Sequence, residues 1–164
     1  MLTVDEIMTT NVVTLQPEEA IFKGMSLMAE MHIRHIPVVD KRHQLLGILS
    51  HRDILRADLS CLANDDQNSR SNVEVTSLKS IMSDKVCSAS PKDSLRSVGL
   101  ILQREKFGCV PIVDDGVLVG IVTDTDFVSV AISLIEEIEN FEDANESLDE
   151  SDEEFETDDA MAIV

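Results

Sequence analysis

The feature that most constrains the fold is an internal repeat. Three short motifs recur at an offset of 74 residues: Ile7-Met8 as Ile81-Met82, Pro17 as Pro91, and Pro37-Val38-Val39-Asp40 as Pro111-Ile112-Val113-Asp114. One residue is then lost, and Gly47-Ile48-Leu49-Ser50 with Asp53 recurs at an offset of 73 as Gly120-Ile121-Val122-Thr123 with Asp126. A register kept over about fifty residues with one deletion indicates two copies of one folding unit, which share a core.

Each copy predicts the element order β-α-β-β-α, and therefore an α/β (α+β) fold. A short strand, Val12–Leu15 or Val86–Ala89, precedes a proline placed to open an amphipathic helix, with Ser90 as the N-cap in the second copy. A hairpin follows, and the Asp115-Gly116 pair is a strong turn signal. The final helix begins at Ser50 or Thr123. The predicted hairpin strands are Ile36–Val39 with Gln44–Leu49, and Cys109–Val113 with Val117–Val122.

Four segments are expected along the chain. Residues 1–60 form the first repeat and residues 78–135 the second. The segment 61–77 is rich in Asn, Asp, Ser and Gln, which predicts a polar linker. Residues 136–164 form an acidic C-terminal extension that begins as a helix and ends as a tail.

Charge and composition narrow the classes of partner. The net charge is −19, with 32 acidic residues against 13 basic ones, and 14 of the acidic residues lie between Glu136 and Asp159. This balance argues against nucleic acid and against an anionic membrane surface, because both require clustered Lys and Arg. The chain has five Phe and no Trp or Tyr, so its core is expected to be aliphatic.

The cysteines and the N-terminal sequence indicate in which cellular compartment the protein is expected. Cys61, Cys87 and Cys109 show no CxxC spacing, so neither a disulfide framework nor a zinc site is predicted. The N-terminus lacks a basic segment followed by a long apolar one, as a signal peptide would have, and no stretch reaches the length of a transmembrane helix. A cytoplasmic protein is expected.

At these motifs the chain resembles a known family. Ile36-Pro37-Val38-Val39-Asp40 followed by Gly47-Ile48-Leu49-Ser50-His51-Arg52-Asp53 looks like a CBS domain, and Gly120-Ile121-Val122-Thr123-Asp124-Thr125-Asp126 looks like the end of another. Together they resemble a CBS pair, or Bateman module, similar to small standalone bacterial CBS-pair proteins. The resemblance implies two repeats about a pseudo-twofold axis with two equivalent clefts. It also implies a homodimer and an adenosyl ligand, such as AMP, ADP, ATP or S-adenosylmethionine.

The Gly-x-x-Ser/Thr-x-x-Asp motif carries the predicted ribose contacts. It places Ser50 and Asp53, or Thr123 and Asp126, one helical turn apart on one face. An ionised Asp can accept hydrogen bonds from both hydroxyls of a ribose. The alternative is a helix capping box, in which the same residues only fix the start of their own helix.

Phosphate contacts are predicted from cations in the first copy. The resemblance implies that Arg34 and His35 reach phosphate, and His51 and Arg52 lie at the start of the final helix. The alternative for each is a surface charge. The second copy has Gly108, Cys109, Asp124 and Thr125 at the matching positions, so we expect two unequal sites, at most one of which suits a highly charged nucleotide.

Base contacts are expected to be apolar and backbone-mediated, although each candidate is also a plausible core residue. The candidates are Thr14, Leu15, Ile36 and Pro37 in the first copy, and Ser88, Ala89, Val110 and Pro111 in the second. His32 and His35 form an HxxH, but two ligands fall short of the four that structural zinc prefers, so no metal is predicted. No cofactor is predicted either.

The C-terminal extension favours two interpretations. Leu134, Ile138, Phe141, Asn145 and Leu148 recur at spacings of four and three, as in a coiled-coil seam, but acidic residues line both flanks and would repel a second copy. The run Asp149–Asp159 has the composition of a disordered tail. The extension is therefore either a solvated tail that aids solubility or a segment that binds a protein partner.

The sequence thus predicts a non-catalytic regulatory module that senses an adenosyl nucleotide. No nucleophile with its base, no phosphate loop and no metal triad is apparent, so an enzyme is not expected. The alternative is a CBS-based module for oligomerisation or protein interaction that binds no ligand.

Overall fold

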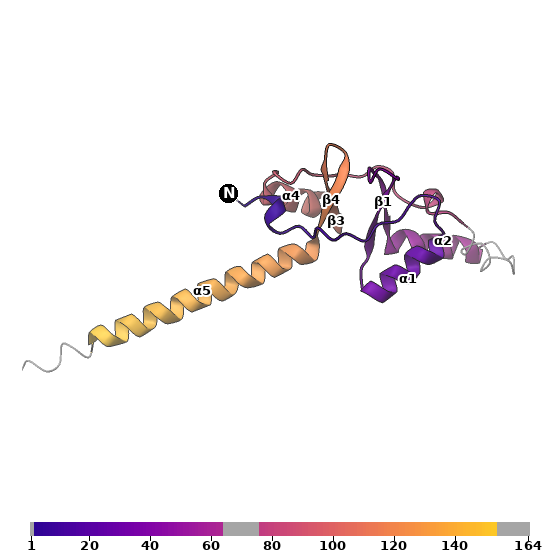
Figure 1. Cartoon of the computed structure of the whole chain (residues 1–164). Helices are drawn as coiled ribbons and strands as arrows, with labels where there is room; N and C mark the ends of the chain where they lie inside the picture. The colour runs from indigo at the N-terminus through magenta and orange to yellow at the C-terminus, as the bar shows by residue number, and fades with distance from the viewer. Residues whose placement is uncertain (1, 64–75, 154–164) are drawn as a thin grey trace, which may run out of the picture. The chain divides into compact units, whose positions relative to one another are not determined.

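The computed structural model describes residues 2–63 and 76–153, and the chain divides into two compact units, Met1–Asp124 and Thr125–Val164. Both repeats lie in the first unit up to the end of the second hairpin. The first repeat contains η1 (Val4–Glu6), α1 (Ile21–Met31), β1 (His35–Val39), β2 (Leu45–Ser50) and α2 (His51–Ala63). The second contains η2 (Leu78–Ser80), α4 (Leu95–Glu105), β3 (Cys109–Asp114), β4 (Val117–Thr123) and the start of α5 (Asp124–Glu153) (Figure 1).

The two hairpins confirm the predicted mixed α/β fold, with every strand end within one residue of its predicted position. β1 pairs antiparallel with β2, and β3 pairs antiparallel with β4. Each pair has one irregularity at the matching place, between Val38 and Val39 and between Ile112 and Val113. Gly116 in the second turn has a φ of 82°, a left-handed conformation that glycine adopts without a steric penalty.

The repeats are joined by an exchange of their N-terminal segments. Val4 and Asp5 donate their backbone N–H groups to the carbonyls of Asp93 and Pro91 in the second repeat, at 3.0 Å each. Reciprocally, Leu78 and Lys79 donate to the carbonyls of Glu19 and Pro17 in the first repeat, at 2.8 and 3.0 Å. The 3-10 turn of each repeat therefore packs against the other repeat.

Isolated backbone pairings repeat this relation across the fold. Thr9 pairs with Ile121 and Ser83 pairs with Ile48, while Gln44 pairs with Val117, which is its own counterpart in the second repeat. A pairing that maps onto itself lies at a twofold axis. The pattern agrees with the predicted pseudo-twofold relation of the two repeats.

The expected first strands are reduced to single bridges. Of Val12–Leu15 only Leu15 pairs, in parallel with Val38, and of Val86–Ala89 only Ala89 pairs, in parallel with Ile112. We call each hairpin with the helices and the 3-10 turn packed on it a lobe. These segments cross from one lobe to the other, because Thr9 and Ser83 pair with the hairpin of the opposite repeat, whereas Leu15 and Ala89 pair with the hairpin of their own. Only the last residue of each segment therefore reaches a strand of its own repeat and pairs with it.

The predicted helix starts at Pro17 and Pro91 were wrong. Both prolines lie in turns, α1 begins at Ile21, and α4 begins at Leu95 with Ser94, not Ser90, as its N-cap. The exchanged segments explain the shift, since the carbonyls of both prolines already accept hydrogen bonds from the opposite repeat. Ser90 instead donates its backbone N–H to the carboxylate of Asp93, at 2.8 Å, which closes the turn.

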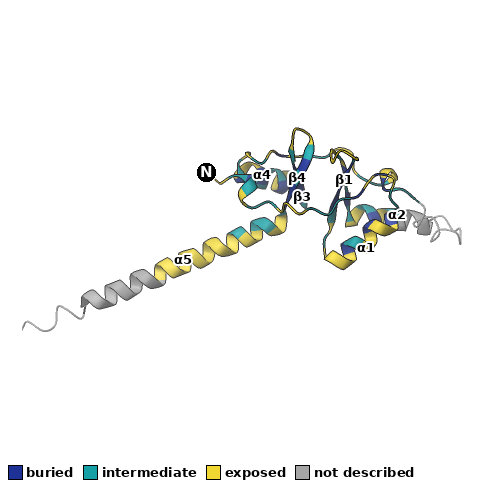
Figure 2. Ribbon diagram, viewed as in Figure 1, coloured by how far each residue is buried: buried dark blue, intermediate teal, exposed yellow. Residues whose placement is uncertain are grey.

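The core is aliphatic, as expected from the scarcity of aromatics. The ribbon of buried residues is coloured dark blue in Figure 2. One cluster fills the first lobe and includes Leu78 from the second repeat, whose side chain is fully buried. The other members of this cluster are Leu15, Ile21, Met28, Ile36, Val38, Leu49 and Ile54.

Helix α5 forms the described part of the second unit. Every residue from 131 to 142 is exposed, as the yellow stretch of α5 in Figure 2 shows. The helix continues to Glu153, so it includes the first residues of the expected disordered run Asp149–Asp159, and the remainder of that run lies outside the described residues. Helix α2 likewise extends through Ala63 into the expected linker, of which residues 64–75 lie outside the described part.

A Leu78→Ala substitution tests the exchange of segments. Removing a fully buried leucine is expected to lower the free energy of unfolding by about 2–5 kcal/mol, measured by urea denaturation. Leu46→Ala serves as the control, because Leu46 is 40% exposed and its truncation should cost much less. Equal losses in the two variants would show that η2 does not complete the core of the first repeat.

Candidate functional site

The predicted ribose and phosphate residues of the first repeat lie together at the open end of the β1–β2 hairpin. His35 begins β1 and pairs with Ser50 at the end of β2. His51 begins α2 and donates its backbone N–H to the carbonyl of Arg34, at 2.9 Å. These two connections hold the backbone of Arg34 and His35 against the start of α2, where His51 and Arg52 adjoin the corner formed by Ser50 and Asp53.

Ser50 and Asp53 form a reciprocal cap at the start of α2. The Ser50 backbone N–H donates to Oδ2 of Asp53 at 2.9 Å, the Ser50 hydroxyl donates to the same oxygen, and the Asp53 N–H donates back to Oγ of Ser50 at 3.2 Å. The Asp53 side chain is 11% exposed, and its Oδ1 lies 3.7 Å from Nη1 of Arg56. Capping, which the sequence allowed alongside a ribose contact, therefore operates here. A diol would compete with the Ser50 hydroxyl or with Arg56 for the carboxylate.

The second repeat has the same backbone arrangement with different side chains. Cys109 pairs with Thr123, and Asp124 donates its backbone N–H to the carbonyl of Gly108, at 3.2 Å. Thr123 is half-buried at the end of β4. Asp126, its predicted ribose partner, belongs to the second unit, within α5.

The open ends of the two hairpins meet, which sequence reasoning could not establish. Nη2 of Arg34 lies 3.7 Å from Oδ1 of Asp124 in the other repeat. The His35 ring lies against Gly108, where a Cβ atom would stand 2.4 Å from Cε1 of the ring. Gly108 occupies the repeat position of Arg34, so the smallest residue in one copy makes room for a side chain of the other. The difference between Gly108 and Arg34 at one repeat position was the feature of the sequence that could have indicated this contact.

The surroundings of His35 disfavour its charged form. Burial is the largest cause that lowers its pKa below the usual 6.5, and the positive charge of Arg34 lowers it further. The carboxylates of Asp124 and Asp53 act in the opposite direction, and Arg52 lowers the pKa slightly. Beside it, burial raises the pKa of the Cys109 thiol to about 12, assisted by Asp124, so this cysteine is a neutral core residue.

The lowered pKa of His35 predicts a dependence of stability on pH. Below pH 6.5 the unfolded chain binds a proton at His35 more readily than the folded one, so the free energy of unfolding rises with pH up to about 6.5 and then levels off. A His35→Gln variant should show a smaller rise in Tm between about pH 5 and pH 7. His51→Gln, which alters an exposed histidine, is the control, and an unchanged slope in His35→Gln would contradict the prediction.

The predicted base contacts are mostly core residues in this structure. Leu15, Ile36, Pro37, Val110 and Pro111 are almost entirely buried, and Ala89 is 6% exposed, so only their backbones could face a ligand. Leu15 already donates its N–H to the carbonyl of Pro37, and Ala89 donates to that of Pro111, both at 3.1 Å. Thr14 is half-buried and Ser88 is exposed.

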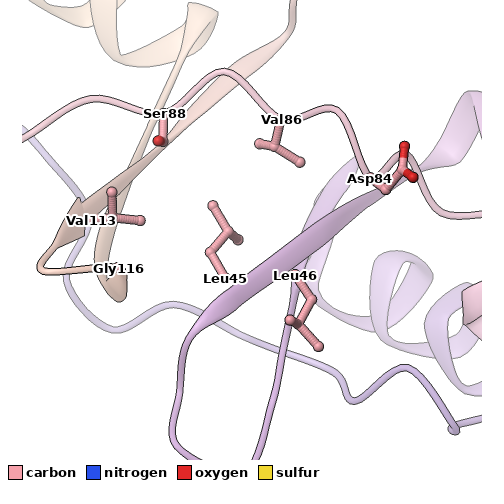
Figure 3. Close-up of a pocket in the computed structure, with 7 residues that line it drawn as sticks. All are labelled: Leu45, Leu46, Asp84, Val86, Ser88, Val113 and Gly116. Atoms are coloured by element: carbon pink, nitrogen blue, oxygen red, sulfur yellow. The ribbon is translucent and has the colours of Figure 1, made fainter.

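A small hollow of about 180 Å³ lies at the turn end of the hairpins, away from the predicted site. Figure 3 shows Leu45 and Val113 facing it from the two hairpins, with Val86 and Ser88 on the crossing segment above. Ser88 is the one predicted base contact that lines it. The other lining residues, which sequence reasoning missed, are Leu45, Leu46, Asp84, Val86, Val113 and Gly116.

The histidines of the HxxH motif have separate structural positions. His32 ends α1 in the left-handed conformation, with a φ of 54°, while His35 begins β1. Within residues 2–63 and 76–153, no three His, Cys, Asp or Glu side chains gather in a way that could hold a metal ion. Among the same residues, no helix combines the length and the apolar character needed to cross a membrane.

The chain belongs to the CBS domain family, whose model matches residues 4–60 and 78–133. Two relatives have similar length and organisation. The CBS domain-containing protein YhcV of Bacillus subtilis is 34% identical over 123 residues, which cover 74% of this chain and 80% of YhcV. The crystal structure of AcuB from Vibrio cholerae is 39% identical, with a TM-score of 0.76, and the match covers 85% of this chain and 98% of AcuB.

Two further structural neighbours hold adenosyl compounds. CBSX2 was solved in complex with AMP, and it is 26% identical with a TM-score of 0.69, over 82% of this chain and 98% of CBSX2. The CBS domain pair of MJ0100 was solved with 5′-methylthioadenosine and S-adenosyl-L-methionine, and it is 26% identical with a TM-score of 0.68, over 81% of this chain and 98% of that pair.

Other relatives are larger proteins. The chain is 31% identical over 121 residues to a homoserine O-acetyltransferase of Methanococcus vannielii, but it spans only 23% of that enzyme. It spans 41% of the protein MJ1225 of Methanocaldococcus jannaschii, at 31% identity.

Proposed function

We propose that this chain is a regulatory module that binds an adenosyl compound at the open ends of its hairpins and does not itself catalyse a reaction. The carrying observation is the Ser50–Asp53 corner, where a nearly buried carboxylate stands at the start of α2, and the first residue of that helix, His51, holds the backbone of Arg34 against the same end of the hairpin. An oriented carboxylate can accept the hydrogen bonds of a ribose diol, and guanidinium groups suit a phosphate. The adenosyl compounds held by CBSX2 and MJ0100 support the same ligand class.

Ligand binding across the junction of the repeats would act on stability and on partners. A ligand at about 100 times its Kd adds about 2.7 kcal/mol to the free energy of unfolding. The ligand can regulate a partner protein only if that partner binds the ligand-bound and ligand-free forms of the module with different affinity. Thr123 and Asp126 are proposed as the corresponding ribose residues of the second repeat, with the base held mainly by the backbone around Leu15, Pro37, Ala89 and Pro111.

We also infer a homodimer. On α1, Phe22 and Met25 lie within one turn on the same side of the helix and are 55% and 39% exposed, and Leu55 on α2 is 48% exposed. The residues that match Phe22 and Met25 in the second repeat are Arg96 and Gly99, so this apolar pair occurs in one repeat only. Exposed apolar side chains on neighbouring helices favour contact with a second copy, and the mass measured by analytical ultracentrifugation tests it.

Asp53→Ala and Asp126→Ala test the ribose assignment. Hydrogen bonds to a charged group contribute about 1.5–3 kcal/mol each, so each substitution should weaken binding at its site about tenfold or more in a calorimetric titration with AMP, methylthioadenosine and S-adenosylmethionine. Asp93→Ala is the matched control, because Asp93 also accepts a backbone hydrogen bond in a turn but lies outside the proposed site.

Two results would count against the ribose assignment. Parent-like binding by both variants would refute the assigned residues while leaving the fold intact. An absence of any binding or Tm shift with the parent at millimolar ligand would refute the sensing function.

A second candidate function, protein interaction through α5, is favoured by its exposed apolar side chains. Leu134, Ile138 and Phe141 follow the spacing of a helical seam and are 51%, 57% and 71% exposed. Glu137 and Glu142 flank this seam, and the chain has no Lys or Arg beyond Lys106. Large apolar side chains exposed together mark an interaction surface, and the acidic flanks match a basic amphipathic helix better than a second acidic copy.

Ile138→Ser, compared with Ile132→Ser, tests the seam. The two isoleucines are 57% and 52% exposed, but Ile132 lies about a third of a turn away from the seam. The probe is a helical peptide with a leucine seam and lysine flanks, and a scrambled peptide of the same composition measures charge attraction alone. Ile138→Ser should weaken binding of the helical peptide about fivefold, and Ile132→Ser less than about twofold, by fluorescence anisotropy. Equal binding of both peptides would leave only non-specific attraction.

A further inference from the structure

The residue that faces the main phosphate candidate is a carboxylate from the other repeat. Arg34 carries the guanidinium expected to hold phosphate, and Oδ1 of Asp124 lies 3.7 Å from it. By sequence Asp124 belongs to the second repeat, whose site was expected to be unequal to the first. The structure instead brings Asp124 to the cation of the first repeat, so its charge acts at the site that seemed better suited to a nucleotide.

The remaining charges at this junction leave only a small positive excess. Asp53 adds a second carboxylate, and Arg52 adds a second guanidinium. His35 is held in its neutral form at neutral pH, because its pKa lies below 6.5, so it contributes no full positive charge. Arg56, whose Nη1 lies 3.7 Å from Oδ1 of Asp53, is a third guanidinium, so three formal positive charges stand against two negative ones, and Asp124 reduces the positive excess from two to one. ATP carries several negative charges, and it would have to displace the Asp124 carboxylate or be repelled by it.

The second repeat offers no replacement for these cations. Its residues at the positions of Arg34, His35, His51 and Arg52 are Gly108, Cys109, Asp124 and Thr125, none of which is positively charged. The Cys109 thiol is neutral and buried. The excess positive charge that could hold a phosphate is therefore confined to the first copy, where Asp124 reduces it to one.

We propose that Asp124 makes this junction selective for adenosyl ligands with little or no negative charge, such as methylthioadenosine, over AMP and especially over ATP. The selectivity rests on the proposed function, since it concerns the ligand bound at the same site. Asp124 acts here as a specificity residue, because its carboxylate lies 3.7 Å from the guanidinium that would hold a phosphate and competes with the phosphate for it. The Asp124 carboxylate does not repel a ligand whose 5′ substituent carries no negative charge.

Asp124→Asn and Glu18→Gln separate this local effect from the change in net charge. Both convert a carboxylate to an amide, and Glu18 is an exposed turn residue outside the junction. Isothermal titration with methylthioadenosine, AMP and ATP should show that the parent binds methylthioadenosine most tightly. In Asp124→Asn, ATP should bind about fivefold to tenfold more tightly, AMP should gain less, and methylthioadenosine should change by less than about twofold. Glu18→Gln should change all three by less than about twofold.

Folding is monitored by Tm in each variant, and Asp124→Ser provides a second replacement that also suits a helix start. The proposal is overturned if the parent binds ATP more tightly than methylthioadenosine, or if neither variant of Asp124 strengthens ATP binding relative to Glu18→Gln. If the parent and all variants bind none of the three compounds, the proposed function itself fails, and the selectivity fails with it. The graded gain from methylthioadenosine to ATP is the result that supports it.

Discussion

The fold depends on the exchange of two short turns between the repeats. Each repeat leaves a position in its core that its own N-terminal segment does not fill, and the segment of the other repeat supplies Val4 or Leu78 there, with no exposed surface. The backbone of the exchanged segment also takes the carbonyls before each first helix, which fixes where those helices begin. Lobe cores, helix starts and the junction between the hairpins therefore follow from one interaction, and neither lobe is complete without the other.

The same junction concentrates the differences between two otherwise matching copies. Backbone pairings correspond almost residue for residue, yet Arg34 and His35 meet Gly108 and Asp124 where the hairpins open. A glycine on one side accommodates an imidazole from the other, and a carboxylate on one side meets a guanidinium from the other. Two identical subunits must have the same residue at matching positions. Two repeats in one chain can differ there, so a symmetric backbone can carry complementary side chains. The asymmetry of the junction lies in these few residues.

The sequence predicted the hairpins well because their signals are local. Asp115-Gly116 marks a turn, and the flanking residues are β-branched or aliphatic, so strand ends were placed within one residue. The start of α4 was misplaced by four residues, since the carbonyls of Pro91 and Asp93 bond to a segment almost ninety residues away. The capping arrangement of Ser50 and Asp53 was predictable from spacing, whereas the contact of Arg34 with Asp124 was not. A repeat shows that two segments are equivalent, but it does not show which copy each one packs against.

The pairing of Gln44 with Val117 has a consequence for the origin of the chain. A contact that the pseudo-symmetry maps onto itself is the kind that two identical subunits make at a true dyad, and the reciprocal lending of η1 and η2 is what domain swapping produces. The geometry is that of an entwined dimer of identical single repeats whose two chains have been joined into one. Joining the two repeats in one chain makes their association independent of protein concentration, and it allows the two halves to differ in sequence, as Arg34 and Gly108 do.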